Sequence, residues 1–186
     1  MDPAGCPSTS AIFLDCDGVL ANARSQLWDF DEGDTTLLHD PAGEIVPLER
    51  RCLTELQRVV ETTGASIVLS TTWRVKPEMR AFLCSALMPF TKDVHDTPQM
   101  HDRGAEVAAW LAANPHVSSY VILDDGHEDA FARAGLSDHF VQTLMRVPDD
   151  ASAEGLTAAK ADAAIALLGE VDIVTKLSPC VHALAL

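Results

Sequence analysis

Three short apolar runs that each end in a group of polar side chains constrain the fold of this chain more than any other feature. The runs cover residues 11–14, 66–69 and 120–123, and the polar groups that follow them are Asp15 with Asp17, Ser70-Thr71-Thr72-Trp73-Arg74, and Asp124-Asp125. Amphipathic helical patterns separate the runs. Strands that alternate with helices at these lengths predict an α/β fold, with a parallel sheet covered on both faces. Because ligands bind beyond the carboxyl ends of parallel strands, we expect the three polar groups to share one site.

The rest of the chain supplies the helices and connections that such a sheet needs. Helices are expected where apolar residues recur at helical spacing between capping or breaking residues. The predicted elements are, in chain order, a strand at 11–14, a loop or small flap at 21–46, a helix opened by Pro47 and closed by Gly64, a strand at 66–69, a helix from Lys76-Pro77 to Pro89, an ambiguous segment at 91–100, a helix capped by Asp102 that stops before Pro115, a strand at 120–123, a short helix at 128–134, a strand near 140–141 and a helix at 157–168.

Length and composition favour one globular domain over residues 1–186, with a core at about 11–168 and a mildly apolar tail at 170–186. Of the 186 residues, 47% are apolar, which suffices for a sizeable core. No apolar stretch is long enough to cross a bilayer and the first residues lack a secretory signal, so we expect a cytoplasmic protein without a membrane partner. The five cysteines are scattered without CxxC spacing, which favours reduced thiols.

The net charge of −15 argues against a large electrostatic footprint on nucleic acid, although it leaves room for a local basic patch.

Asp15 and Asp17 follow directly on a strand that should be buried. An ionised carboxylate leaves water only when it is paired or metal-bound, so two of them at one strand end suggest a divalent-cation site. Cys16 lies between them and should point the opposite way, which makes it a buried spacer rather than a nucleophile.

Each of the three strand-end signals is weak alone, but their order resembles the haloacid dehalogenase superfamily of phosphotransferases. The strand followed by Asp-x-Asp-Gly matches from Ile12 to Val19, the strand that ends in Ser matches at 67–70, and the strand that ends in acidic residues matches at 121–125. The likeness is closer to the small-phosphatase-like branch found as domains in RNA repair proteins, through Ser70 to Arg74, Arg103 to Leu111 and Leu123 to Asp125. The resemblance implies a three-layer α/β/α Rossmann-like fold with a minimal cap.

The resemblance also implies roles for the carboxylates. Asp15 would attack phosphorus to form an aspartyl-phosphate, and Asp17, on the same side, would serve as general acid and then as general base. Mg²⁺ would be held by the Asp15 side chain, the Asp17 backbone carbonyl and one carboxylate of Asp124-Asp125. We favour Asp125 as the direct ligand, with Asp124 behind it. The plain alternative for Asp124-Asp125-Gly126 is a solvated turn.

Further residues would complete a phosphate cradle. Ser70 would bind a phosphoryl oxygen, with Thr71 and Gly18 lining the substrate site, although a helix cap is the simpler role for Ser70. The family's third motif is a lysine or arginine that balances the negative charge of the nucleophile and the phosphate. Arg103 is expected to take this position, with Lys92 as second choice. Arg74 is expected to hold substrate, although an exposed arginine needs no function.

The remaining polar and aromatic candidates receive weaker predictions. The spacing of His95, His101 and His127 matches no metal motif, so surface or packing roles are favoured. Trp73 and Trp110 are expected to pack in the core or at its rim. The candidates for auxiliary roles are Trp28, for substrate contact, and Asp129, for orienting waters.

The predicted function is therefore that of a Mg²⁺-dependent phosphohydrolase. The chain leaves little room for a cap domain, and an open site suits a phosphate monoester on a macromolecule, such as a nucleic-acid end or a phosphoprotein, or else a nucleotide. One alternative is a non-catalytic module that keeps the fold and binds or regulates a partner. Carbon–halogen cleavage is disfavoured, because it has no use for Asp17 as an acid on the leaving group.

Overall fold

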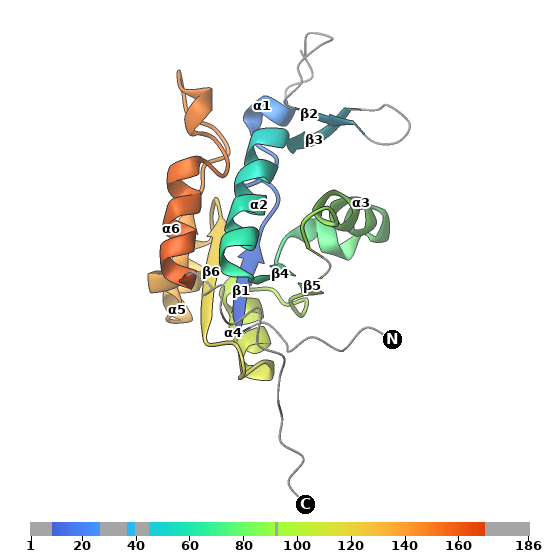
Figure 1. Ribbon diagram of the computed structural model, residues 1–186. Helices are drawn as coiled ribbons and strands as arrows, with labels where there is room; N and C mark the ends of the chain where they lie inside the picture. The colour runs from blue at the N-terminus through green and yellow to red at the C-terminus, as the bar shows by residue number, and fades with distance from the viewer. Residues whose placement is uncertain (1–8, 27–36, 40–44, 92, 170–186) are drawn as a thin grey trace, which may run out of the picture.

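The centre of the structure is a five-stranded parallel sheet. A computed structural model describes residues 9–26, 37–39, 45–91 and 93–169. The strands are β1 (Ser10–Leu14), β4 (Ser66–Leu69), β5 (Val94–Asp96), β6 (Ser119–Asp124) and β7 (Phe140–Gln142), in the order β5-β4-β1-β6-β7. All neighbours pair in parallel. The first strand of the chain therefore lies in the middle of the sheet (Figure 1).

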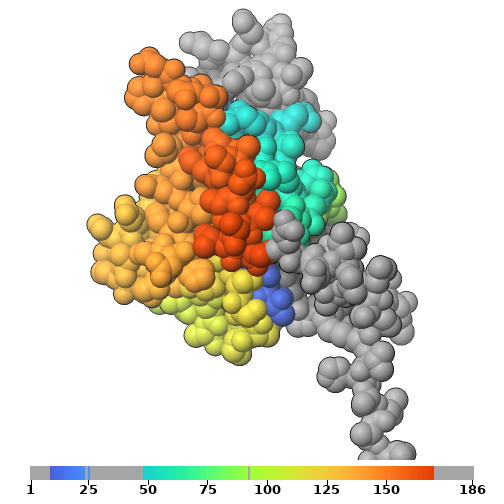
Figure 2. All heavy atoms as spheres, turned by 60° about the vertical axis from the view of Figure 1, so that its left-hand side comes forward, coloured from blue at the N-terminus to red at the C-terminus, as the bar shows by residue number. Residues whose placement is uncertain are grey.

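Helices cover both faces of this sheet. The helices are α2 (Arg50–Thr63), α3 (Pro77–Leu87) and α6 (Ala158–Leu168) on one face, and α4 (Arg103–Ala113) and α5 (Glu128–Arg133) on the other. Alternate residues of β1 divide between the two cores, because Ile12 and Leu14 pack with the first group of helices and Phe13 packs with the second. Figure 2 shows α2 and α6 side by side on the surface of one face. The predicted three-layer α/β/α fold is confirmed.

A small two-stranded sheet stands between β1 and α2 in the chain. After α1 (Ala23–Gln26), β2 (Leu37–His39) and β3 (Ile45–Glu49) pair antiparallel. All three lie beyond the end of the main sheet toward which β1 points (Figure 1). They occupy the segment expected to be a flap, although residues 27–36 and 40–44, including Trp28, lie outside the described residues.

The prediction that Pro47 opens the next helix is wrong. Pro47 lies within β3, and α2 begins only at Arg50. Proline is tolerated in a strand where its missing N–H is not needed for pairing, as it can be in this two-stranded sheet. The backbone N–H of Glu49, the residue that precedes the helix, donates to the Leu20 carbonyl at 2.8 Å. A contact across 29 residues therefore fixes where the helix starts.

The other predicted helix ends are confirmed closely. The Asp102 side chain accepts from the Ala105 N–H at 2.9 Å and caps α4, and Thr157 caps α6 in the same way. Gly64 ends α2 with a φ of 65°. The ambiguous segment contains β5, a three-residue edge strand. Short 3₁₀ turns, η1 (Thr72–Val75), η2 (Ser137–His139) and η3 (Ala151–Ala153), complete the connections.

Among the helices that the structure describes, none has the length and apolar character needed to cross a membrane. The tail at 170–186 lies outside the described residues.

Candidate active site

The polar groups that follow β1, β4 and β6 come together at one end of the sheet, as predicted. The Asp15 N–H donates to the Leu123 carbonyl at 2.9 Å, which continues the pairing of β1 with β6. On the other side, the Ser70 N–H donates to the Leu14 carbonyl at 3.0 Å. The backbone of the central strand therefore holds its first aspartate between the ends of its two neighbours.

Three carboxylates form a cluster that fits a metal ion. One oxygen from each of Asp15, Asp124 and Asp125 lies within 4.8 Å of the others. Asp15 is 7% exposed and Asp124 is fully buried. An all-oxygen set of carboxylates, two of them buried, is the donor chemistry that Mg²⁺ prefers. These residues fit the ion that the resemblance implies.

The electrostatics of the cluster agree with that fit. Burial, and secondarily the Asp15 charge, raises the pKa of Asp124 to about 7. Burial also raises the pKa of Asp15, against the opposing effect of the Arg103 guanidinium. The pKa of Asp125 is raised by burial and then by the nearby charge of Asp17. Bringing all three carboxylates into their ionised form at this site requires positive charge beside them.

Asp124 and Asp125 are held by different contacts. One Asp124 oxygen, Oδ1, accepts from the Gly126 N–H at 2.9 Å, while the other, Oδ2, is buried without a hydrogen-bond partner. Asp125 packs on Gly18, where an added Cβ would lie 2.3 Å from the Asp125 side chain. Both carboxylates belong to the cluster, so the preference for Asp125 as the direct ligand stays a prediction.

The turn after β1 separates the polar residues from Cys16. The Cys16 carbonyl accepts from the backbone N–H groups of Val19, Leu20 and Ala21, and Gly18 has a φ of 73°. Cys16 itself is fully buried in the core, and burial raises the pKa of its thiol well above the usual range. It is the buried spacer that the sequence predicts. In this structure the absence of a side chain at Gly18 makes room for Asp125. A contact between Gly18 and substrate stays a prediction.

Arg103 is the cation that faces the carboxylates. Its Nη1 lies 3.5 Å from Asp15 Oδ1 and 3.8 Å from Asp124 Oδ2, and its side chain is 8% exposed. The first turn of α4 places it there, and Glu106, one turn later, lies 3.6 Å from its Nε. The alternative cation, Lys92, lies outside the described residues. Arg103 as the cation that the resemblance implies, with Lys92 as the alternative, stays a prediction.

The segment from Ser70 to Arg74 borders the same cluster. Ser70 Oγ is buried without a hydrogen-bond partner, and the Thr71 hydroxyl hydrogen-bonds Asp15, which lowers the pKa of that carboxyl. The Trp73 indole N–H donates to Asp17 Oδ2 at 3.0 Å. Asp17 is outside the three-carboxylate cluster, in keeping with a ligand role for its carbonyl alone.

Arg74 makes internal contacts rather than reaching an open surface. It forms a buried ion pair with Glu106 at 2.9 Å, and its guanidinium also donates to the carbonyls of Ser70, Thr71 and Thr97. In this structure Arg74 fastens the Ser70 turn to α4. Its substrate-binding role stays a prediction.

Buried polar atoms without hydrogen-bond partners gather at this end of the sheet. Within the described part of the chain they are Ser70 Oγ, Arg103 Nη1, Asp124 Oδ2 and Thr143 Oγ1. Thr143 follows β7, and its N–H donates to the Asp124 carbonyl at 2.9 Å. Such atoms are costly in a folded protein and commonly mark a functional site. Both a phosphate oxygen and a metal ion would find partners here.

The remaining candidates are not members of the three-carboxylate cluster. His95 pairs with Asp93 at 2.7 Å, whereas His101, His127 and Asp129 are exposed. No histidine belongs to a metal-binding group among the described residues. The role of Asp129 in orienting waters stays a prediction.

Trp110 packs edge to face on Phe13 at 5.4 Å, as expected of a core residue.

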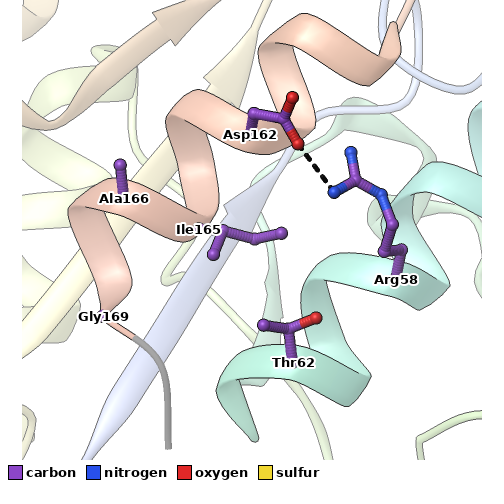
Figure 3. Close-up of a pocket in the computed structure, with 6 residues that line it drawn as sticks. All are labelled: Arg58, Thr62, Asp162, Ile165, Ala166 and Gly169. Carbon is purple, nitrogen blue, oxygen red and sulfur yellow. Dashed lines mark hydrogen bonds and ion pairs between the residues drawn. The ribbon is translucent and has the colours of Figure 1, made fainter.

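A separate open pocket of about 610 Å³ lies between α2 and α6 (Figure 3). An ion pair between Arg58 and Asp162, 2.7 Å apart, spans it. The pocket contains none of the residues predicted for the site.

Sequence reasoning missed the contacts that Trp73, Glu106 and Thr143 make at this candidate site. Trp73 was expected only to pack, and it does pack against the core while also binding Asp17. Its place between Ser70 and Arg74 was the available signal. Glu106 and Thr143 carry no sequence signal, because their roles depend on partners far away along the chain.

The order of the strands and the residues at their ends define the class of protein. A DxDG turn follows the central strand, a serine follows one neighbouring strand, paired aspartates stand at the end of the other, and an arginine faces Asp15 and Asp124, which is the arrangement of a haloacid dehalogenase-type (HAD) domain. The sequence model of one family, described as the HAD domain in Swiss Army Knife RNA repair proteins, matches residues 11–161. The chain belongs to that family. A comparison with curated proteins finds no match.

Proposed function

We propose that this chain is a Mg²⁺-dependent phosphohydrolase that cleaves phosphate monoesters through an aspartyl-phosphate on Asp15. One observation carries the proposal: the Asp15 carboxylate lies at the end of the central strand, in a cluster with two other aspartates and beside one arginine, and buried polar atoms without hydrogen-bond partners lie at the same end of the sheet. A purely structural strand end has no need of such a costly arrangement. Membership of a family of HAD domains supports the same reaction class.

The residues that would hold Mg²⁺ are Asp15 and the pair Asp124-Asp125, with the Asp17 carbonyl. When bound, Mg²⁺ supplies positive charge between these carboxylates and the incoming phosphate dianion. Arg103 adds a second positive group on the same side, 3.5 Å from Asp15. The unpaired Ser70 hydroxyl is available to donate to a phosphoryl oxygen.

The first half of the reaction transfers the phosphoryl group to the protein. A carboxylate oxygen of Asp15 bonds to phosphorus while the bond between phosphorus and the ester oxygen breaks. Asp17 gives its proton to the departing oxygen, which leaves as an alcohol. Phosphoryl transfer of this kind depends mainly on positioning and charge neutralisation, which the buried site supplies.

The second half releases phosphate. Asp17, now ionised, takes a proton from a water molecule as the water oxygen bonds to phosphorus. The bond between phosphorus and Asp15 breaks, and both aspartates return to their starting forms. Asp17 thus acts as acid and then as base, in keeping with its position outside the metal cluster.

The proposed substrate is a phosphate on a macromolecule, such as a nucleic-acid end or a phosphoprotein, or else a nucleotide. The description of the family as a domain of RNA repair proteins supports a nucleic-acid end. The net charge of −15 opposes an extended contact with a polyanion, so recognition would be confined to the terminal phosphate. A panel of RNA oligonucleotides with 3′ or 5′ phosphates, a phosphopeptide and nucleoside monophosphates would rank these substrates.

The test of the reaction is hydrolysis of a broad panel of phosphate esters with Mg²⁺ and with EDTA. We expect Asp15→Asn to lower turnover by about 10³-fold or more, because it removes the nucleophile. Asp162→Asn, which breaks an exposed ion pair on α6, is the matched control and should keep full activity. With labelled substrate, the native protein should also show a hydroxylamine-labile phosphoprotein that Asp15→Asn lacks.

The proposal fails if no member of the panel shows Mg²⁺-dependent turnover above that of Asp15→Asn. The chain would then be a non-catalytic HAD-fold module that binds or regulates a partner.

A further inference from the structure

The Trp73 indole contacts the Asp17 carboxyl group directly. Its Nε1 donates to Asp17 Oδ2 at 3.0 Å, across 56 positions in the chain. The indole ring is half-buried and packs against the core on the face covered by α2 and α6. Trp73 therefore connects the core to the residue proposed to move the proton.

The backbone on both sides of Trp73 is fastened. The Thr71 hydroxyl accepts from the Trp73 N–H at 3.3 Å and starts η1, and the same side chain hydrogen-bonds Asp15. On the other side, Arg74 is buried in its ion pair with Glu106. A ring held by its packing and by both neighbours can position the group it binds.

Resting on the proposed function, we propose that Trp73 is a positioning residue that fixes the Asp17 carboxylate for proton transfer to the leaving oxygen. An indole N–H can only donate a hydrogen bond, so it holds Oδ2 as an acceptor and cannot itself take the proton. The contact therefore orients the Asp17 carboxyl group without exchanging a proton with it.

This role predicts a dependence on the leaving group. A nitrophenolate leaves without a proton, whereas an alkoxide needs one as it departs, so only alkyl esters depend strongly on a well-placed acid. Trp73→Phe keeps a large aromatic ring and removes the N–H. The variant should therefore lose activity selectively on alkyl phosphates.

The experiment compares kcat/KM for glycerol phosphate and p-nitrophenyl phosphate, because this constant includes departure of the leaving group. We expect Trp73→Phe to lose about ten-fold or more on glycerol phosphate and less than about three-fold on p-nitrophenyl phosphate. Asp17→Asn should lose at least about 10²-fold on glycerol phosphate. Adding Trp73→Phe to Asp17→Asn should change the ratio between the two substrates no further.

Trp110→Phe is the matched control, because Trp110 is a buried tryptophan that packs on Phe13. This variant should leave the ratio between the two substrates unchanged. Equal losses on both substrates in Trp73→Phe would overturn the inference and leave the proposed function standing. Absence of Asp15-dependent turnover in the native protein would instead overturn the proposed function and the inference with it.

A second measurement keeps the inference testable if Trp73→Phe does not fold. The chain has three tryptophans, so its indole N–H groups give three signals that Trp110→Phe and Trp28→Phe assign by exclusion. In Asp17→Asn the Trp73 signal should shift, because the group that accepts its hydrogen bond changes from a carboxyl to an amide. The Trp110 signal should stay in place. An unchanged Trp73 signal would show that the contact is absent in solution and would overturn the inference.

Discussion

At the scale of single residues, Gly18 shows how closely the acidic cluster is packed. Its φ of 73° is a conformation that side chains disfavour, and a Cβ there would lie 2.3 Å from Asp125. Both the backbone turn after β1 and the close packing of Asp125 therefore require glycine at position 18. The sequence shows Gly18 as part of a motif, but only the fold shows that it makes room for Asp125.

Gly18→Ala should weaken Mg²⁺ binding by displacing Asp125. The measurement is the rise in melting temperature on adding Mg²⁺, which follows from binding to the folded state alone. We expect this rise to be reduced or lost in Gly18→Ala. Gly135→Ala is the control, because Gly135 has a similar φ of 72° with nothing within 4 Å of an added Cβ. If Mg²⁺ raises the melting temperature of both variants equally, the close contact between position 18 and Asp125 has no specific effect on Mg²⁺ binding.

Arg74→Met should act chiefly on stability. Arg74 and Glu106 form a buried pair, and removing one partner from such a pair costs about 3–5 kcal/mol of unfolding free energy. Arg80→Met breaks a more exposed ion pair with Asp96 and should cost less than about 1 kcal/mol. Denaturant unfolding would measure both. A raised KM for substrate with unchanged stability would instead support the substrate-binding role predicted for Arg74.

The grouping of the carboxylates with Ser70 and Arg103 at one end of the sheet could be predicted, because each stands at a strand end or helix start within a short motif. Glu106 could not, because its role comes from Arg74 and Arg103 on different segments. The hydrogen bond from Trp73 to Asp17 could not be predicted either, because the two residues lie on different segments. A motif shows which residues are chemically suited to a site, whereas the supporting contacts depend on three-dimensional neighbours.

At the scale of elements, α4 is the helix that places the Arg103 guanidinium beside the carboxylates, and its first turn packs tightly on α5. Gly104, next to Arg103, is the point of closest approach, since an added Cβ would lie 2.2 Å from the Ala130 carbonyl oxygen. The absence of a side chain at Gly104 therefore lets α4 approach α5 closely enough to bring Arg103 to the cluster.

Gly104→Ala should force α4 and α5 apart and carry Arg103 with it. We expect a loss of about 1–3 kcal/mol in the free energy of unfolding, and a lower kcat/KM on every substrate. Gly126→Ala, where nothing lies within 4 Å of the added Cβ, should be neutral for stability. Thermal unfolding and steady-state kinetics measure the two effects. A Gly104→Ala variant as stable and active as the native protein would contradict this packing.

Elements with strong local signals were the ones that could be predicted. The Asp102 and Thr157 caps and Gly64 mark their helix ends by short-range chemistry, and the structure confirms them. The start of α2 was misplaced because its apolar pattern continues back into β3, where pairing with β2 decides the conformation. Strand β5 has three residues and an edge position, so its existence depends on pairing with β4.

At the scale of the whole molecule, the buried acidic cluster makes stability depend on pH. The pKa of Asp124 is raised from its ordinary value to about 7, so in the metal-free protein the folded state holds a proton that the unfolded state releases. The stabilisation that the protonated Asp124 side chain contributes is complete below the pKa that this group has in the unfolded chain. It is lost as the pH rises toward about 7. The raised pKa of Asp15 acts in the same direction.

The melting temperature in EDTA should therefore fall between pH 5 and pH 8, by about 2–4 °C for each kcal/mol lost. Asp124→Asn should flatten the fall, whereas Asp129→Asn, at an exposed position, should keep it. Adding Mg²⁺ should restore stability at pH 8 more than at pH 5, because the ligands must be ionised to bind it. A melting temperature that rises with pH in EDTA would contradict the raised pKa values of Asp124 and Asp15.

The order of strands in the sheet also has a consequence for how the protein is made. β1 emerges from the ribosome before its neighbours β4 and β6, which follow about 55 and 110 residues later. Until both have been synthesised, one of the most apolar stretches of the nascent chain has at least one unpaired edge, and synthesis at about 5–20 residues per second leaves it so for several seconds. The site around Asp15 is consequently a late product of translation, and nascent chains that stall before residue 124 would be targets for chaperones that hold exposed strands.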